Sequence, residues 1–255
     1  MTGTFLPKIL EQKAKEVAQM EREDLGDLRQ AVPFYDYLKS HSQQIQVIAE
    51  VKKASPSLGD INLDVDLLAQ AKTYQAAGAA MISVLTDEHF FKGNIDYLRQ
   101  ISSQVSIPTL AKDFIIDEKQ IIRARNAGAT VILLIVAALS QERLQELYQY
   151  ATDLGLEVLV ETHNAKELAR AHALGAKIIG VNNRNLVTFK TDLQTSLDLA
   201  THFREEPVYI SESAIQSGQD VAKLAPYFDG ILVGTALMTA GNPAQKIKEL
   251  RIDKG

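Results

Sequence analysis

Short apolar runs alternate along the chain with longer stretches that are apolar on one side only. The apolar runs are IQVIAEV, AMISVL, TLA, TVILLIV, EVLVE, KIIGVN, VYIS and GILVG. Between them lie helical patterns such as LDVDLLAQAKTYQAAG, DEKQIIRARNAG, SQERLQELYQYATDLG and NAKELARAHALG. Several runs are apolar on both faces, which is typical of parallel strands covered by helices. The alternation therefore predicts an α/β fold with a parallel sheet built from strand–helix units.

A weak internal repeat supports these units. Gly78, Gly128 and Gly175 each end a helical pattern, and each is followed by alanine and an apolar run. Glycine can take the left-handed conformation that ends a helix and turns the chain into the next strand. Eight units follow one another from Ile45, and we therefore expect a closed (β/α)8 TIM barrel rather than an open doubly wound sheet.

Residues 1–44 precede the first expected strand. Phe5, Ile9, Val17 and Met20 fall on one face of a helix, with lysine and glutamate elsewhere. The segment is too short to hold a stable core alone. We expect residues 1–255 to form one barrel domain, with residues 1–44 as an N-terminal helical extension that caps the barrel.

Composition narrows the range of functions. The chain has 255 residues and no cysteine, so disulfides, zinc–thiolate sites and cysteine nucleophiles are excluded. The net charge is −5 and no basic stripe appears, which argues against a nucleic-acid partner. The first twenty residues are charged, and no apolar run is long enough for a signal peptide or a membrane span. We expect a cytoplasmic protein without a membrane partner.

The five histidines show no metal-ligand spacing, and we expect neither a metal nor a cofactor. His163 lies two residues beyond Glu161, and we interpret it as a loop residue.

Polar residues follow every expected strand except the fourth, which ends in apolar Leu133, Leu134 and Ile135. In a barrel the carboxyl ends of the strands meet on one face, where active sites lie. Each polar residue alone is consistent with a solvated loop, but together they indicate a functional face. In strand order they are Glu50 and Lys52; Thr86, Asp87 and Glu88; Lys112 and Asp113; Glu161; Asn182, Asn183 and Arg184; Ser211, Glu212 and Ser213; and Gly234 and Thr235.

The last two strands carry the features of a phosphate site. Barrels frequently bind phosphate between the loops after strands seven and eight, at the N-terminus of a short helix. Gly234 permits close approach of the backbone, and the hydroxyl groups of Ser213 and Thr235 can donate hydrogen bonds. The expected phosphate-binding residues are Lys52, Ser213, Ala214, Gly234 and Thr235, with Ser55 approaching from strand one. The alternative for the Gly-Thr-Ala segment is an ordinary turn.

Charges of both signs are expected to meet in the same bowl. Glu50, Glu161 and Glu212 would stand there with Lys52 and Lys112. Such groups shift one another's pKa, and acid and base roles become available near neutral pH. The alternative is a structural ion-pair network, which perturbs pKa values equally well.

Eight segments resemble the indole-3-glycerol phosphate synthase family, and together they cover nearly the whole chain. They are IAEVKKASPS, ISVLTDEHFFKG, LAKDFIID, ILLI, VLVETH, IIGVNNRNL, YISES and LVGTALM, in this order. The resemblance implies an anionic sugar-phosphate substrate, 1-(2-carboxyphenylamino)-1-deoxyribulose 5-phosphate. This compound loses carbon dioxide and water as the indole ring closes.

The resemblance also implies roles for the charged residues. Lys112 would be the general acid that protonates the ribulose carbonyl oxygen during ring closure. Glu161 would be a base or acid in the dehydration. Glu50 and Lys52 would pair beside the reacting centre, with Lys52 sharing the acid role or touching the phosphate.

The remaining roles concern substrate binding. Asn182 would orient the substrate and Arg184 would lie near its polar groups, while Glu212 and Ser213 would close the site. The anthranilate ring would contact apolar wall residues, drawn from Phe90, Phe91, Phe114, Leu133 and Ile135. For Leu133 and Ile135 a place in the ordinary core is an equal alternative.

The chain departs from the family pattern at two positions. Leu58 stands where a lysine is common, and Ala214 follows Ser213 where glycine is usual. Glycine there serves either a positive φ or the close approach of phosphate. Because alanine at positive φ would store strain, we expect Ala214 at negative φ, with its N–H facing the phosphate and with Ala214→Gly destabilising the fold.

Three other functions remain open at this point. One is another phosphate-binding barrel such as phosphoribosylanthranilate isomerase. Another is a Schiff-base aldolase that uses Lys112, and the third is a barrel that binds the sugar phosphate without turnover. In each case we expect a monomer or a weak homo-oligomer.

Overall fold

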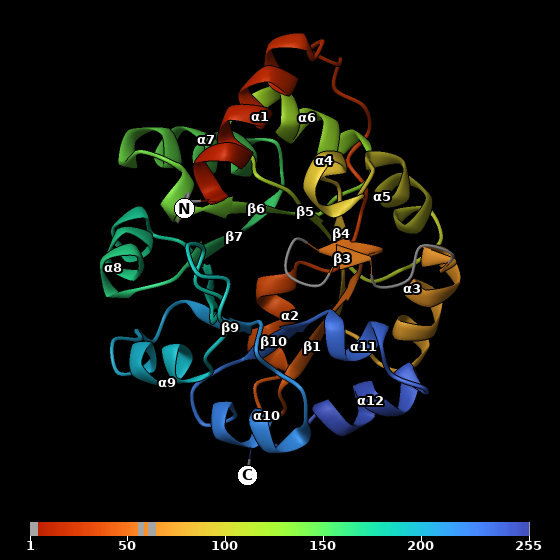
Figure 1. Cartoon of the computed structure of the whole chain (residues 1–255), viewed down its shortest axis with the longest axis vertical. Coiled ribbons are helices and arrows are strands. Elements are labelled where there is room, and N and C mark those ends of the chain that lie inside the picture. The colour runs from red at the N-terminus through yellow and green to blue at the C-terminus, as the bar shows by residue number, and fades with distance from the viewer. Residues whose placement is uncertain (1–4, 56–58, 61–64, 255) are drawn as a thin grey trace.

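The computed structural model describes residues 5–55, 59–60 and 65–254, and its centre is a closed barrel of eight parallel strands. In chain order the barrel strands are β1 (Gln46–Val51), β4 (Met81–Leu85), β5 (Thr109–Lys112), β6 (Val131–Ile135), β7 (Glu157–Thr162), β8 (Ile178–Asn182), β9 (Val208–Glu212) and β10 (Gly230–Val233). Each strand pairs with its neighbours in chain order (Figure 1). The predicted TIM barrel is confirmed.

Helices surround the barrel in a ring. They are α3 (Leu67–Ala76), α4 (Glu88–Phe91), α5 (Ile95–Ser102), α6 (Glu118–Asn126), the 3-10 helix η1 (Val136–Ala138), α7 (Gln141–Asp153), α8 (Ala165–Leu174), α9 (Gln194–Ala200), α10 (Gly218–Leu224), α11 (Thr235–Met238) and α12 (Pro243–Leu250). A small antiparallel pair, β2 (Ala54–Ser55) and β3 (Gly59–Asp60), follows β1. The sequence did not predict this pair, because two residues per strand leave no periodicity to recognise.

The expected turns into the strands take the left-handed conformation. The φ angles are 94° at Gly78, 91° at Gly128 and 75° at Gly175. Beyond each glycine the chain enters a barrel strand, so the repeated Gly-Ala pairs mark the amino end of the barrel. The helix starts are also fixed by residues close in sequence. At α6, Asp117 and Gln120 form a capping box.

The barrel interior is filled by alternate side chains of every strand. Ile48, Met81, Leu110 and Leu159 belong to this inner cluster and are fully buried. The intervening side chains of the same strands, such as Val47, pack instead against the surrounding helices. Two separate apolar layers therefore hold the strands, and the polar ends of the strands lie beyond the inner layer.

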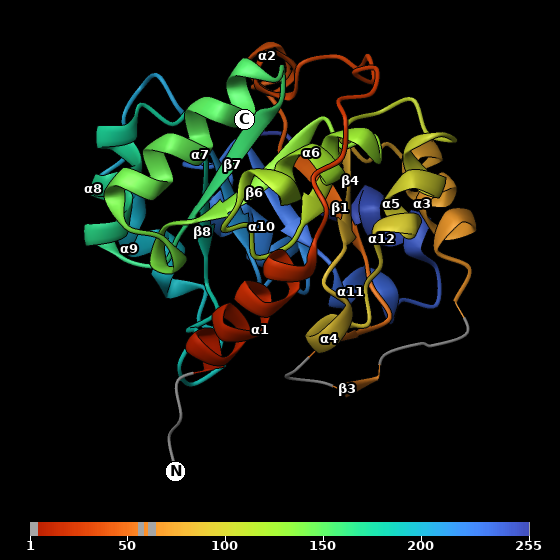
Figure 2. The same ribbon diagram turned by 90° about the horizontal axis from the view of Figure 1, so that it is seen from above.

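The N-terminal extension covers both ends of the barrel. Helix α2 (Phe34–Ser40) buries Phe34 and Leu38 in the inner cluster. Its first N–H groups, those of Phe34 and Tyr35, donate to the carboxylate of Glu157 at the start of β7. Helix α1 (Phe5–Gln19) lies on the side of the molecule opposite α2 (Figure 2). It covers the carboxyl ends of the strands.

Helix α1 is fastened to the barrel by a buried ammonium group. Ile9 and Val17 are buried, as their spacing predicts, but Lys13 is also buried. Its Nζ lies 2.7 Å from Asp87 and 2.9 Å from Asp113. The expectation that lysine stays off the buried face is wrong for Lys13, because two carboxylates at the strand ends receive its charge.

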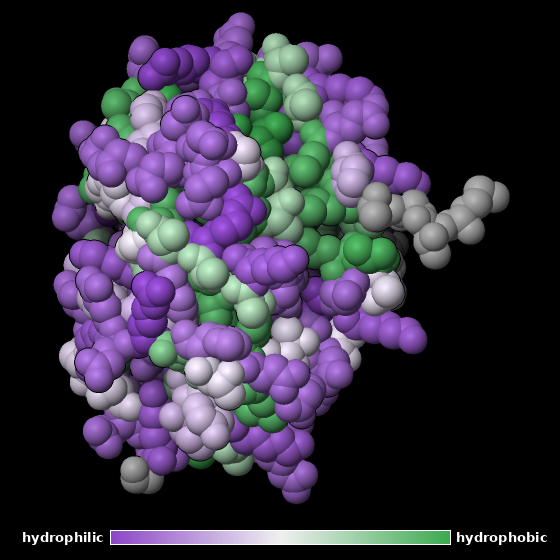
Figure 3. Space-filling model, turned by 90° about the vertical axis from the view of Figure 1, so that its left-hand side faces the viewer, coloured by the Kyte–Doolittle hydropathy of each residue, from purple (hydrophilic) through white to green (hydrophobic). Residues whose placement is uncertain are grey.

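The outer surface of the helical ring is mainly polar. Figure 3 shows the side carrying α7 and α8 as largely hydrophilic, with a strip of hydrophobic side chains crossing it. No helix in the described part of the chain is long and apolar enough to cross a membrane.

Replacing Lys13 with alanine is expected to destabilise the fold strongly. The variant leaves the buried carboxylate of Asp87 without the Lys13 cation and leaves Asp113 with Arg123, 4.0 Å away, as its remaining cation in the described part of the chain. Breaking a buried ion pair in this way costs about 3–5 kcal/mol. Urea unfolding measures the loss. The matched control is Lys15→Ala on the exposed side of α1, where the pair with Glu11 is solvated and its loss changes the stability little. Equal losses in the two variants would contradict the proposed role of Lys13.

Candidate active site

A cavity of about 350 Å³ lies at the carboxyl ends of the barrel strands, beneath α1. Helix α1 contributes Phe5, Leu6 and Ile9 to its wall. The strands contribute the polar groups, because each barrel strand directs its last inward-facing residue into the same space. The cavity is thus closed on one side by the barrel core and on the other by the extension.

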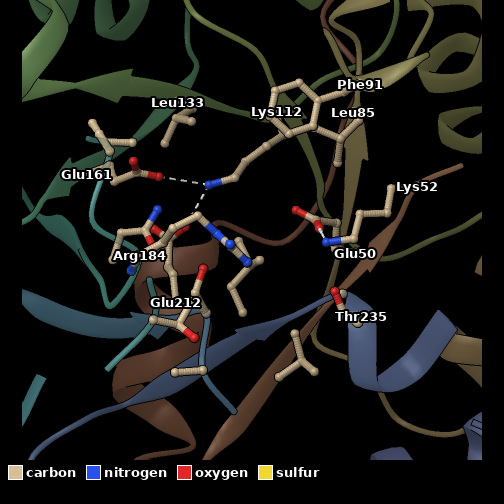
Figure 4. A pocket seen from close by; sticks show the side chains of 18 of the residues that line it. Glu50, Lys52, Leu85, Phe91, Lys112, Leu133, Glu161, Arg184, Glu212 and Thr235 are labelled. Carbon is tan, nitrogen blue, oxygen red and sulfur yellow. Dashed lines mark hydrogen bonds and ion pairs between the residues drawn. The ribbon is translucent and has the colours of Figure 1, made fainter. Parts of the chain in front are cut away.

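The ammonium group of Lys112 stands at the centre of this cavity. It extends from the end of β5, and its Nζ lies 2.6 Å from Oε2 of Glu212 and 2.9 Å from Oε2 of Glu161 (Figure 4). The Glu212 side chain is 1% exposed and that of Glu161 is 3% exposed, so water hardly reaches either carboxylate. The carboxylates of Glu161 on β7 and Glu212 on β9 therefore both bind the ammonium group of Lys112.

These three groups shift one another's pKa in different directions. Burial alone would lower the pKa of Lys112, but Glu161, Glu212 and Glu50 reverse this and raise it above its usual range. Burial would raise the pKa of Glu161, but Lys112 and His163 outweigh burial and hold it well below its usual value. Burial and the charge of Glu161 raise the pKa of Glu212 to about 7. Near neutral pH, one carboxylate is ionised and the other can carry a proton.

A second ion pair lies on the β1 side of the cavity. Nζ of Lys52 is 2.8 Å from Oε1 of Glu50 (Figure 4). Gly234, at the end of β10, faces this pair, and a Cβ there would collide with the Glu50 carboxylate and come within 2.8 Å of the Lys52 nitrogen. The absence of a side chain at position 234 therefore makes room for the pair.

Asn182 and Arg184 enter the cavity from the end of β8 and the loop after it. The amide oxygen of Asn182 accepts from the backbone N–H of Arg184 at 3.0 Å, and the guanidinium donates to the carbonyl of Phe189 at 3.2 Å. Burial lowers the pKa of Arg184, while Glu50 raises it in part. The loop thus brings a further cation to the wall of the cavity.

The expected phosphate end is formed by the chain after β9 and β10. Ser213, Ala214, Gly234 and Thr235 all line the cavity, with Lys52 nearby. Helix α11 begins at Thr235. This grouping is the one that the strand order predicts, because closure of the ring brings β10 next to β1.

The expectation of a negative φ at residue 214 is wrong. Ala214 has φ 62°, and Ser213 before it has φ 66°. Two neighbouring contacts support this left-handed turn: Asn183 donates to the carbonyl of Ser213 at 3.2 Å, and the following Ile215 is buried. The surroundings hold the turn in place even without glycine, which the comparison of residue types alone could not show.

The structure brings nearly all of the predicted site residues together. Those lining the one cavity are Glu50, Lys52, Lys112, Phe114, Leu133, Glu161, Asn182, Arg184, Glu212, Ser213, Ala214, Gly234 and Thr235. Only the backbone of Ser55 is described, in β2, and Leu58 lies outside the described residues, so the expectations for them stay predictions. Phe91 and Ile135 also line the cavity, whereas Phe90 packs edge-on against Phe5.

Sequence reasoning missed several residues of the site. Leu186 and Phe189 reach the cavity from the loop after β8, and Leu6 reaches it from α1. His163, interpreted as a loop residue, lies 3.2 Å from the Glu161 carboxylate. Its position two residues beyond Glu161 was the available signal, because the chain turns sharply there into α8.

Ala214→Gly is expected to stabilise the protein, contrary to the sequence-based expectation. A left-handed conformation costs an L-residue roughly 1–2 kcal/mol, while the extra freedom of glycine in the unfolded chain costs about 0.4–1 kcal/mol. The net gain is on the order of 0.5–1 kcal/mol in urea unfolding. Ala77→Gly is the control, because Ala77 has φ −80° and loses stability on the same change. If Ala214→Gly instead lowered the free energy of unfolding, the sequence-based expectation that glycine destabilises this position would be correct.

The comparisons with known proteins agree with this geometry. The model of the indole-3-glycerol phosphate synthase family matches residues 6–250. The chain is similar to the proteins named indole-3-glycerol phosphate synthase from Streptococcus thermophilus and Streptococcus pneumoniae. Each is 72% identical over 255 residues, with 100% of both chains covered.

Among solved structures, the fold is similar to that of 3-hexulose-6-phosphate synthase from Salmonella typhimurium, with a TM-score of 0.65 and 15% identity. The match covers 81% of this chain and 96% of the other and concerns the fold alone. The family match and the 72% identity over full length lead to one conclusion: this chain belongs to the indole-3-glycerol phosphate synthase family.

Proposed function

We propose that this chain is a carboxy-lyase that makes indole-3-glycerol phosphate in tryptophan biosynthesis. The substrate is 1-(2-carboxyphenylamino)-1-deoxyribulose 5-phosphate, which undergoes ring closure, decarboxylation and dehydration. The observation that carries the proposal is the Lys112 ammonium shared by Glu161 and Glu212 in a cavity that also holds the expected phosphate end. The family match supports the same reaction.

The cavity has room for both ends of such a substrate. Phe114, Leu133 and Ile135 offer an apolar wall to the anthranilate ring. Ser213 and Thr235 offer hydroxyl groups to the phosphate on another part of the wall. Lys112 lies among the charged groups of the same cavity and can reach the ribulose carbonyl of a substrate placed in this way.

In the ring closure, the aromatic carbon that bears the carboxylate attacks the ribulose carbonyl carbon. The carbonyl oxygen receives the proton of Lys112 and becomes a hydroxyl. Loss of carbon dioxide returns an electron pair to the ring. A positioned ammonium stabilises the developing oxyanion far better in a dry site than in water.

A tightly held proton makes Lys112 a weak acid while both of its carboxylate partners are ionised. Protonation of Glu212, whose pKa is raised to about 7, removes one of these charges. The ammonium then gives up its proton more readily. One oxygen of Glu212 is buried and has no hydrogen-bond partner among the described residues, which suits a carboxyl group that gains and loses a proton.

The dehydration needs a base that takes the ring proton and an acid that protonates the departing hydroxyl. Glu161 is the ionised carboxylate of the pair and suits the base role. Glu212 and Lys112 can supply the other proton. Carboxylates whose pKa values are pushed apart by their surroundings commonly divide acid and base roles in this way.

The remaining polar residues would bind and orient. Asn182 and Arg184 approach the substrate from the loop after β8, and the Glu50–Lys52 pair stands between the reacting centre and the phosphate. Lys52 can contact the phosphate, together with Ser213 and Thr235. Ser55 is proposed to join them.

The family also indicates the type of substrate. The family acts on a phosphorylated small molecule. We further propose that residues 1–255 work as one domain, with residues 1–44 as its capping extension. We expect the protein to act in the cytoplasm as a monomer or weak homo-oligomer, without a nucleic-acid or membrane partner.

The direct test is to add the carboxyphenylamino substrate to the purified chain and follow the appearance of indole fluorescence. A phosphoribosylanthranilate isomerase, or a barrel that only binds the sugar phosphate, would release no carbon dioxide and form no indole.

Lys112→Ala is expected to reduce kcat heavily in a protein that still folds, although loss of the cation beside Glu161 and Glu212 lowers its stability. General acid–base groups contribute about 10²–10⁴-fold to rates. Steady-state kinetics measure the loss, and thermal melting checks the fold. Lys53→Ala is the control, because Lys53 lies over the ring of Tyr97 and does not line the cavity.

Near wild-type turnover in Lys112→Ala would contradict the general-acid role. Borohydride treatment in the presence of substrate provides a second check. A covalent adduct at Lys112 would indicate the Schiff-base aldolase instead.

Thr235→Val is expected to weaken substrate binding more than the chemical steps. The variant keeps the shape of the side chain but removes its hydroxyl, and remote binding energy also helps to align the reacting centre, so some loss of kcat accompanies the rise in KM. Inorganic phosphate competes with the substrate in the wild type and competes less in the variant. Thr239→Val, one turn along on an exposed position, leaves both unchanged. Absence of phosphate inhibition in the wild type would argue against this phosphate site.

A further inference from the structure

His163 lies between two carboxylates immediately beyond the end of β7. Its side chain is 10% exposed. Nδ1 is 2.9 Å from Oε2 of Glu167, and Nε2 is 3.2 Å from Oε1 of Glu161. The second contact has ion-pair distance but lies off the line of a good hydrogen bond. The imidazole therefore connects the first turn of α8 to a central carboxylate of the cavity.

The Glu167 side of this contact is held firmly by α8. The backbone N–H of His163 donates to the same Glu167 oxygen at 2.9 Å, and the Asn164 amide donates to the other oxygen at 2.6 Å. Asn164 is also the N-cap of α8, accepting from the N–H groups of Lys166 and Glu167. The helix start thus fixes the carboxylate, and the carboxylate fixes the ring of His163.

The Glu161 side is held from two directions. Oε2 accepts from Lys112 at 2.9 Å, while Oε1 faces the imidazole. Rotation of the carboxylate would break one of these contacts or both. Glu212 differs, because one of its oxygens has no hydrogen-bond partner in the described part of the chain.

The imidazole is cationic near neutral pH. Burial would lower the pKa of His163, but the contacts with Glu161 and Glu167 raise it to about 10. Glu161 is therefore flanked by two cations, and it also interacts with the Glu212 carboxylate on β9. His163 and Glu167 also line a second cavity, and the other charged groups in its wall are Arg184, Lys190 and Asp192.

We infer that His163 is a positioning residue for the proposed reaction. Its imidazolium, oriented by Glu167, holds the Glu161 carboxylate ionised and in line with Lys112. Glu161 can then act as the base of the dehydration without first losing a proton. The inference rests on the proposed function, and it adds a residue outside the lining of the catalytic cavity.

The test compares His163→Ala, His163→Gln and Glu167→Gln in steady-state and single-turnover kinetics, after melting has shown which variants are folded. His163→Ala is expected to lower kcat by about 10- to 100-fold, the loss associated with a misplaced catalytic group. KM changes little, because His163 does not line the cavity that takes the substrate. In a single turnover, carbon dioxide appears ahead of indole, because the dehydration depends on Glu161.

The pH profile separates charge from mere packing. Activity that needs ionised Glu161 is lost as the pH falls through the pKa of that carboxyl group. Removing the imidazolium raises this pKa, so the acid limb of kcat moves toward neutral pH in His163→Ala. His163→Gln keeps a donor near Glu161 without the charge, and it recovers part of the rate but not the position of the acid limb. Glu167→Gln lowers kcat and moves the acid limb toward neutral pH, each by a smaller amount than His163→Ala does.

His172→Gln is the matched control. His172 lies on α8, and its Nε2 contacts the hydroxyl of Tyr209 at 3.0 Å, away from the cavity. Its kinetics and pH profile stay those of the wild type. An active wild type with an unchanged kcat and acid limb in folded His163→Ala, or an effect on KM alone, overturns the inference. A wild type without indole formation overturns the proposed function instead.

Discussion

Closure of the barrel between β1 and β10 is the constraint on which the rest of the structure depends. Gln46 to Ala49 pair with Gly230 to Val233, and this pairing completes the ring. A Cβ at Gly230 would lie 3.0 Å from both the Gln46 carbonyl oxygen and the Ile210 side chain. The first and last strands can approach because this position has no side chain. Once the ring is closed, groups far apart in the chain, such as Lys52 and Thr235, share one small space.

Buried charges in this protein serve two different ends. Both Lys13 and Lys112 contact two buried carboxylates, and Lys13 also pairs with the less buried Glu16. Burying an ion pair costs desolvation free energy, and well-packed apolar residues in its place often give a protein that is equally stable. Lys13 faces the barrel rim and joins the extension to it, whereas Lys112 points into a cavity where its proton can be used. The difference lies in access to a ligand and not in the type of residue.

Most of the fold could be predicted because each barrel unit is a local pattern. The apolar runs, the helix periods and the left-handed glycines agree with one another, and their number led to closure. The polar strand ends then predicted which side chains would meet in one cavity. Features that depend on distant partners could not be predicted. Lys13 is buried because its ammonium group pairs with Asp87 and Asp113 at the strand ends. The left-handed turn at Ala214 depends in part on the hydrogen bond from Asn183 to the Ser213 carbonyl. The position of the His163 ring depends on its contact with Glu167, which the first turn of α8 brings beside it.

The balance of charge in the cavity affects how substrate binding is linked to protons. Lys52 and Lys112 are already paired with carboxylates, and Arg184 lies near Glu50. The substrate adds only negative charge, through its phosphate and its carboxylate. The added charge further favours the protonated form of Glu212, whose pKa is already raised to about 7 by its surroundings. Binding therefore favours uptake of a proton from the solvent, and the reaction itself consumes one proton, because the charged carboxylate leaves as neutral carbon dioxide. Substrate binding and turnover are thus both linked to the uptake of protons.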